Sequence, residues 1–224
     1  MSWLARIELD GDMVARLRIA DSYDWHRRLW GCFPDEPNKK RDFLTRVDFL
    51  EGSVRAWLLA EHRVVCPDWC PREAFAVREV AAGFLSHRYY AFDLRANPTK
   101  ALVQREPDGS PKLKSNGKRT SGKRVPLVSN QDLRSWIDRK GRDGGFLISE
   151  ARPLDIGPMV ESYFRKKEAA AYHGGVQFRG VLEVTEPSLF AETYKKGIGA
   201  AKSFGFGLFL LAPIDIKGEE NEAS

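Results

Sequence analysis

The stretch Phe43-Leu-Thr-Arg-Val-Asp-Phe-Leu-Glu-Gly-Ser-Val-Arg-Ala-Trp-Leu-Leu-Ala60 predicts a β-hairpin. Residues 43–50 and 54–60 are strand-like, and Glu51-Gly52-Ser53 between them supplies a polar, glycine-containing turn. A further strand is expected before the hairpin at residues 3–9, where apolar and polar side chains alternate. After it, residues 67–75 predict a turn with a short helix, and residues 76–81 predict a fourth strand.

A helix is expected between the first strand and the hairpin. Asp21 or Ser22 is a suitable N-cap, Asp24 in the first turn suits the helix dipole, and Pro34 ends the segment. The apolar side chains recur at i, i+4, i+7 and i+8, which is the spacing of a core-facing stripe: Trp25, Leu29, Cys32 and Phe33. The predicted order of strand, helix, strand, strand, short helix, strand is the split βαβ order of a ferredoxin-like unit.

The rest of the chain predicts a second unit of the same kind, with insertions. Its expected elements are strands at 86–94, 146–148, 176–184 and 207–212, and helices at 130–139 and 187–194. The fold class is therefore α+β, with two tandem ferredoxin-like (βαββαβ, RRM-like) domains, the second carrying a basic hairpin insertion. The expected division is residues 1–84 for the first domain, 85–216 for the second and 217–224 for an acidic tail.

The composition is that of an ordinary folded protein and excludes a fibrous or disordered chain. The 224 residues carry 36 Lys+Arg against 31 Asp+Glu, a formal net charge of +5. No apolar stretch approaches the roughly 18–20 residues that cross a bilayer, and no secretory signal pattern is visible. Three cysteines are an odd number and too few for a disulfide scaffold. We expect a cytoplasmic protein without membrane partners.

The positive charge is concentrated in one segment, residues 95–128, where nine basic residues face only two acids, Glu106 and Asp108. The basic residues are Arg95, Lys100, Arg105, Lys112, Lys114, Lys118, Arg119, Lys123 and Arg124. Glycines and prolines interleave with them, which predicts a basic loop or hairpin between ordered elements. Such a segment suits a polyanion, because phosphate neutralisation dominates nucleic-acid affinity. A solvated surface loop is the alternative.

A second glycine-rich segment, Gly197-Ile-Gly-Ala-Ala-Lys-Ser-Phe-Gly-Phe-Gly207, lies between a predicted helix and the last predicted strand. Glycines let a backbone approach a phosphate closely, and turn N–H groups form anion-binding nests. A nucleotide P-loop does not fit, because the order is helix, loop, strand and Lys202 follows Ala201 instead of a glycine. We expect this loop to hold an RNA backbone, with a turn needed only for packing as the alternative.

The first helix carries the candidate catalytic group. Tyr23, His26 and Trp30 fall at i, i+3 and i+7, on a face different from the core stripe, with Arg27 and Arg28 beside them. A histidine that titrates near neutral pH, a phenol and nearby cations are suited to metal-free RNA cleavage, in which protons move between the ribose 2′-OH and the leaving 5′-oxygen. A structural histidine beside a tyrosine is the alternative.

Other chemistries find less support. His62, Cys66 and Cys70 supply only three potential zinc ligands, without the two-residue knuckle spacing, so small buried cysteines beside turn prolines are the favoured interpretation. There is no clustered carboxylate pair for two-metal catalysis and no Gly-x-Ser-x-Gly elbow. We expect no metal and no small-molecule cofactor.

Several stretches resemble a known family. Residues 197–207 followed by Leu208-Phe-Leu-Leu-Ala-Pro213 are similar to the C-terminal motif of CRISPR-associated repeat-RNA endonucleases. Further stretches resemble the type I-E branch, the CasE family, in the order of that family. They are Ser22-Tyr-Asp-Trp-His-Arg-Arg-Leu-Trp30 with Phe33-Pro34, Arg41-Asp-Phe-Leu44, Leu94-Arg-Ala-Asn-Pro-Thr-Lys100 and Lys123-Arg-Val-Pro-Leu127.

The resemblance implies two tandem ferredoxin-like domains and metal-independent cleavage of CRISPR precursor RNA at the base of each repeat hairpin. The products would carry a 2′,3′-cyclic phosphate and a 5′-OH, and the chain would stay on the guide RNA with other type I-E Cascade subunits. His26 falls on the family's catalytic histidine and Tyr23 on the assisting tyrosine. Some members add a downstream lysine, whereas Gly31 follows Trp30 here and the nearest lysines are Lys39 and Lys40, so Arg27 is a possible substitute.

Twelve residues are expected to bind RNA, drawn from the first helix, the basic segment and the glycine-rich loop. They are Arg27, Arg95, Lys100, Lys112, Lys114, Arg119, Lys123, Arg124, Gly199, Lys202, Ser203 and Gly205. Two alternatives to an enzyme stay open. One is a double RRM-like module that holds RNA without cutting it, with Phe204 and Phe206 available for base stacking. The other is a structural subunit of a ribonucleoprotein in which His26 only packs.

Overall fold

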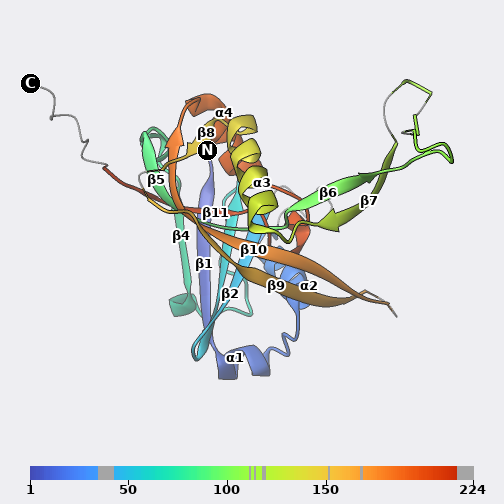
Figure 1. Cartoon of the computed structure of the whole chain (residues 1–224). Helices are drawn as coiled ribbons and strands as arrows, with labels where there is room; N and C mark the ends of the chain where they lie inside the picture. Colours follow the sequence, from blue (N-terminus) through green and yellow to red (C-terminus); the bar gives the residue numbers. More distant parts are fainter. Residues whose placement is uncertain are drawn as a thin grey trace, which may run out of the picture.

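The structure is a computed structural model that describes residues 1–34, 43–110, 112–113, 115–117, 120–150, 152–166 and 169–215. These residues form a four-stranded sheet, a five-stranded sheet and a separate two-stranded ribbon (Figure 1). Among them, no helix is both long and apolar enough to span a bilayer.

The first sheet contains β1 (Trp3–Asp10), β2 (Phe43–Leu50), β3 (Ser53–Ala60) and β4 (Phe75–Glu79) in the order β2-β3-β1-β4. All neighbouring strands are antiparallel. The hairpin expected at residues 43–60 is confirmed, with its register running from Phe43 opposite Ala60 to Leu50 opposite Ser53. Gly52 has φ +73°, a left-handed conformation that favours glycine in this turn.

The helix that carries the candidate catalytic residues is α2 (Ser22–Leu29), which continues into the 3₁₀ turn η1 (Trp30–Cys32). The Asp21 side chain accepts hydrogen bonds from the backbone N–H groups of Tyr23 and Asp24, both at 2.9 Å, and so caps the helix. The expected stripe of Trp25, Leu29, Cys32 and Phe33 is buried against the first sheet. Shorter elements complete this half: α1 (Gly11–Arg16), η2 (Arg72–Ala74) and η3 (Ala82–Leu85).

The second sheet repeats the pattern of the first. Its main path is β11-β5-β10-β8, built from β5 (Tyr89–Ala96), β8 (Phe146–Ile148), β10 (Ala169–Val184) and β11 (Phe209–Pro213). The helices α3 (Asn130–Asp143) and α4 (Pro187–Lys196) pack buried side chains into the core of this sheet. Two ferredoxin-like units are therefore present, and the predicted fold class is confirmed.

One strand and half of another were not expected. β9 (Asp155–Lys166) pairs with β10, and β10 starts at Ala169, seven residues before the predicted strand. Residues 169–175 are alanine- and glycine-rich, and such residues have low strand propensity. Their strand conformation depends on the partner strand, from Ala169 opposite Lys166 onward, and not on a local pattern.

The basic segment also forms the structure that was expected. β6 (Thr99–Val103) and β7 (Ser121–Pro126) make an antiparallel ribbon, which stands out from the body in Figure 1. Such a ribbon makes few long-range contacts, so the side chains on both of its faces are accessible to solvent.

The two sheets share one core, because the first sheet is apolar on both faces. Leu4, Leu59 and Leu44 lie side by side across β1, β3 and β2. Leu44 and Leu59 are buried in the cluster that includes Leu94 and Leu208 of the second unit. The domain boundary near residue 84 stays a prediction, and the shared core shows that the two units are not independent in packing.

A charged network crosses the same interface. The Arg46 guanidinium, 4% exposed, pairs with Asp48 at 2.8 Å and with Asp93 of β5 at 2.6 Å. Burial alone would raise the pKa of Asp93, but the hydrogen bonds and positive charges of Arg46 and Arg179 together outweigh burial and hold that pKa below its usual range. Arg95 adds ion pairing to Asp48 at 2.7 Å and donates to the Val47 carbonyl at 2.7 Å. These contacts fix how the second unit sits on β2.

Candidate active site and nucleic-acid interface

The imidazole of His26 is held by two aromatic neighbours. Trp30 Nε1 donates to His26 Nε2 at 3.2 Å, and the Phe43 ring stacks on the imidazole with centroids 6.2 Å apart. Trp30 meets Phe43 edge-on at 4.9 Å. His26 Nδ1 is buried, and the Trp30 donor engages the other ring nitrogen, Nε2. The side chain as a whole is half-buried and does not lie in the hydrophobic interior.

Tyr23 lies one helical turn before His26, as the sequence spacing requires. Its side chain is 40% exposed, so the phenol is open to a ligand. The two residues therefore present a phenol and an imidazole from the same side of α2.

The glycine-rich segment 197–207 packs beside α2. Its 3₁₀ turn η4 (Lys202–Phe204) contacts both α2 and β2. Ser203 is exposed, and Lys202 Nζ donates to the Lys196 carbonyl at 2.7 Å. Gly205 has φ +87° and lies over β2, where an added Cβ would be 3.8 Å from the Thr45 carbonyl.

Part of this segment serves packing. An added Cβ at Gly207 would be 2.5 Å from the Ile198 carbonyl oxygen, and Ile198 N–H donates to the Gly207 carbonyl at 3.0 Å. Gly199 is half-buried and faces the Trp136 ring, which an added Cβ would meet at 3.3 Å. The packing interpretation therefore applies to the ends of the loop, and an RNA contact by residues 202–205, where η4 lies against α2, stays a prediction.

The β6–β7 ribbon displays cations on both of its faces. Lys100 lies opposite Val125 and Ala101 opposite Arg124. Because strand side chains alternate between faces, Lys100 and Arg124 point to opposite sides of the ribbon. Lys100, Lys123, Arg124 and Lys112 are all exposed. Lys114 and Arg119 lie outside the residues that the structure describes, as do Lys39 and Lys40.

Arg95 occupies a different environment from the other predicted RNA-binding residues. It is tied to Asp48 and Val47, its side chain is only 22% exposed, and burial lowers its pKa. The RNA contact that we expected of Arg95 stays a prediction, and the Arg95 guanidinium is held in the interface between the two units. The spacing in the sequence could not show this, because Asp48 is distant along the chain.

Arg27 is exposed and borders a cavity on the flank of α2. This cavity has a volume of about 530 Å³ and is also lined by Arg16, Arg18 and Arg28. Arg28 is anchored, donating to the Leu17 carbonyl at 2.5 Å. Gly31, which follows Trp30, is packed by Pro67 and Trp69, each 3.4 Å from an added Cβ.

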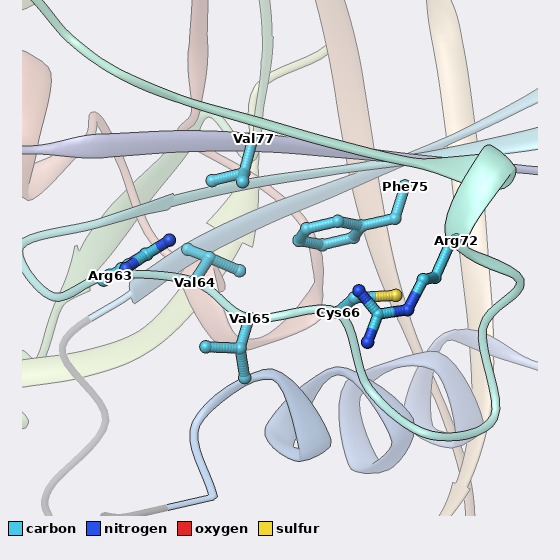
Figure 2. A pocket seen from close by; sticks show the side chains of 7 residues that line it. All are labelled: Arg63, Val64, Val65, Cys66, Arg72, Phe75 and Val77. Atoms are coloured by element: carbon cyan, nitrogen blue, oxygen red, sulfur yellow. The ribbon is translucent and has the colours of Figure 1, made fainter.

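The cysteines lie in packed surroundings. Burial raises the pKa of the Cys32 and Cys70 thiols to about 12, and the Cys66 thiol donates to the Cys70 carbonyl at 3.5 Å. Within the described ranges, no cluster of three or more His, Cys, Asp or Glu side chains has the arrangement of a metal site. A second cavity, of about 430 Å³, is lined by Arg63, Arg72, Cys66, Phe75 and three valines. Figure 2 shows these side chains, with Arg63 and Arg72 at opposite ends.

Phe43, Arg16 at the end of α1 and Arg18 in the turn between α1 and α2 were missing from the predicted site. Phe43 lies in the family-like stretch Arg41-Asp-Phe-Leu44, but its contact with His26 joins β2 to α2, and no local pattern specifies that contact. The pair of arginines at 16 and 18 was visible as charge, but its approach to α2 was not. β9 also contacts α2, and that strand was not expected.

Comparisons with known proteins agree with this architecture. The family described as "CRISPR associated protein" matches residues 2–213. The CRISPR system Cascade subunit CasE of Escherichia coli K12 is 30% identical over 206 residues, covering 90% of this chain and 97% of that protein. The CRISPR-associated endoribonuclease Cse3 of Thermus thermophilus is 26% identical over 230 residues, covering 94% of this chain and 100% of that protein.

A solved structure shows the same fold with RNA present. Thermus thermophilus Cse3, bound to an RNA that represents a pre-cleavage complex, superposes with a TM-score of 0.68 at 25% identity. The match covers 95% of this chain and 99% of the Cse3 chain. From the matched family, the two relatives and the shared fold, we conclude that this chain belongs to the type I-E CasE family of CRISPR-associated proteins.

Proposed function

We propose that the chain is an endoribonuclease that cuts CRISPR precursor RNA at the base of each repeat hairpin. The observation that carries this proposal is the contact between α2, which bears His26 and Tyr23, and η4 of the glycine-rich loop. The two elements come from different ferredoxin-like units, and their contact supports a site in which a titratable group acts beside backbone suited to hold phosphate. The RNA-bound Cse3 relative supports the choice of substrate.

In the proposed reaction, the ribose 2′-oxygen attacks the adjacent phosphorus, and the bond from phosphorus to the 5′-oxygen breaks. His26 acts in general acid/base catalysis, and Tyr23 orients or activates the 2′-hydroxyl. The products are a 2′,3′-cyclic phosphate and a 5′-OH. Because the nucleophile belongs to the RNA, no metal-bound water is needed, and we propose a metal-independent reaction.

In this proposal, residues around the site bind the RNA substrate. Lys202, Ser203 and Gly205 contact the RNA backbone near the cut, and the exposed cations of the β6–β7 ribbon hold the hairpin. A-form stems are recognised mainly through shape, phosphates and 2′-hydroxyls, which suits a cationic ribbon. The cleaved stem keeps most of these contacts, so the chain stays on the guide RNA as a subunit of a Cascade assembly, as the Escherichia coli relative is named.

The test is a cleavage assay on the repeat RNA of the same CRISPR array. His26→Ala should slow single-turnover cleavage by about a hundredfold to ten-thousandfold and leave hairpin affinity nearly unchanged. Replacing the 2′-OH at the cut with hydrogen should stop the reaction, whereas excess EDTA should leave the rate unchanged. A His26→Ala protein that cuts within tenfold of the wild-type rate removes His26 from the mechanism.

A second candidate function is RNA binding without cleavage, and one observation favours it. The Trp30 N–H donates a hydrogen bond to His26 Nε2, as it would to a histidine that has only a packing role. The same assay separates the candidates, because a binding module retards the repeat RNA in a gel and never shortens it.

A further inference from the structure

The arginine cavity beside α2 is not used by the mechanism above. It is formed where the α1–α2 turn approaches the flank of α2 and the loop around Trp69, and its charged lining is Arg16, Arg18, Arg27, Arg28 and Asp24. Four cations therefore face one carboxylate within one recess of about 530 Å³.

Among the residues that the structure describes, most of this charge has no neutralising partner. Arg16, Arg18 and Arg27 are exposed, and none of them has an ion pair in the part of the chain that the structure describes. Asp24 Oδ2 accepts a backbone hydrogen bond from Ala20 at 3.1 Å. Like charges gathered in one recess repel one another, so an anionic ligand would stabilise the arrangement.

The walls of the recess are fixed by several contacts. Arg28 holds the α1–α2 turn through the Leu17 carbonyl at 2.5 Å, and its guanidinium lies 5.9 Å from the Trp69 ring centroid. Trp69 Nε1 donates to the Arg28 carbonyl at 3.2 Å. Arg18 has φ +51°, which a non-glycine residue rarely adopts, and the next residue, Ile19, is buried. Arg18 is thus displayed by a turn anchored on both sides.

We propose that the arginine cavity binds the phosphodiester backbone of unpaired RNA that flanks the repeat hairpin. Guanidinium groups form paired hydrogen bonds with phosphate oxygens, and the half-buried Trp69 ring offers a surface for a base. The recess has the volume of a small-ligand pocket, which suits a single nucleotide. RNA is favoured over an acidic protein because the proposed function brings RNA to α2, the helix that carries both His26 and the cavity residues Arg27 and Arg28.

The inference rests on the proposed function and extends the substrate beyond the hairpin. The unpaired strand has two sources, the 5′ flank and the 3′ flank of the repeat stem. The experiment measures dissociation constants for repeat RNA with a 2′-deoxy nucleotide at the cut, as a bare hairpin, with the 5′ flank or with the 3′ flank. The proteins are wild type, the double variant Arg16→Gln/Arg18→Gln, and the charge-matched control Arg63→Gln/Arg72→Gln from the cavity of Figure 2.

Wild type should bind one flanked RNA more tightly than the bare hairpin, and the double variant should lose that advantage. Removing the contact to one single-strand phosphate lowers the salt slope by about 0.7, which corresponds to about fivefold in affinity at 0.1 M salt. Removing the contacts to two phosphates corresponds to about 25-fold. The bare-hairpin affinity and the control variant should stay at wild-type values. The flank whose affinity falls identifies the bound strand.

Arg18→Gly is a second variant that removes the charge without disturbing the fold, because glycine suits the left-handed φ of this position. It should unfold at or above the wild-type temperature and lose about fivefold in flanked-RNA affinity. Wild-type affinities in these variants would overturn the inference and leave an acidic protein as the ligand class. An equal loss on the bare hairpin, or in the control, would also overturn it. A wild-type chain that binds none of the RNAs contradicts the proposed function itself, and this inference with it.

Discussion

Replacing Trp30 with phenylalanine tests how His26 enters the reaction. His26 Nδ1 is buried, so the proposed mechanism requires the RNA to reach Nε2, and the Trp30 N–H donates to that atom at 3.2 Å. This hydrogen bond must break before Nε2 can exchange a proton with the substrate. Phenylalanine removes the donor and retains an aromatic ring at residue 30, where the tryptophan ring meets Phe43 edge-on at 4.9 Å.

The expected effect follows from the net value of one hydrogen bond. Such a bond contributes about 0.5–1.5 kcal/mol, so its removal should raise the cleavage rate by about 2-fold to 13-fold. The measurement is single-turnover cleavage of repeat RNA at saturating protein, which isolates the chemical step from product release. The double variant His26→Ala/Trp30→Phe should be as slow as His26→Ala, which shows that the gain passes through His26.

A tenfold or greater loss of rate in Trp30→Phe would refute this reasoning. It would mean that the Trp30 bond holds the imidazole in its reactive orientation and does not compete with the substrate. Thermal unfolding of the variant separates that result from a loss of packing against Phe43.

Three other predictions concern the interface between the units, the ribbon and the glycine-rich loop. Asp93→Ala removes one partner of the buried Arg46 and should destabilise the fold by about 3 kcal/mol in denaturant titrations at pH 7. Because the folded-state pKa of Asp93 is lowered, its contribution is complete above about pH 4 and is lost as the pH falls through the folded pKa, so the two proteins should converge in acid. Lys100→Gln/Lys123→Gln should weaken binding of every repeat hairpin. The slope of log affinity against log salt concentration should fall by about 0.9 for each phosphate that the ribbon no longer neutralises. An unchanged slope would show that the ribbon does not touch phosphate. Gly205→Ala forces a side chain into φ +87° and should lower the free energy of unfolding by about 1–2 kcal/mol, checked by thermal and denaturant unfolding; a stability equal to wild type would contradict the strain expected there.

Local patterns in the sequence predicted most of the elements. The hairpin at residues 43–60, the capped helix that follows Asp21 and the core stripe of Trp25 and Leu29 appear in the structure as expected. These features are set by neighbours along the chain, through turn geometry, capping and helical periodicity. β9 escaped prediction because its pairing with β10, and not its own composition, makes it a strand.

The candidate site divides in the same way. The sequence by itself determined that Tyr23 and His26 share one side of a helix, since helix geometry places residues three apart together. It also determined that residues 95–128 form a cationic segment. Only the tertiary structure decided that Arg95 faces Asp48, that Phe43 stacks on His26 and that the α1–α2 turn closes an arginine cavity against α2. Each of those contacts joins residues from different elements, and their approach is fixed by strand pairing and by the packing of one sheet on the other, which no local pattern specifies.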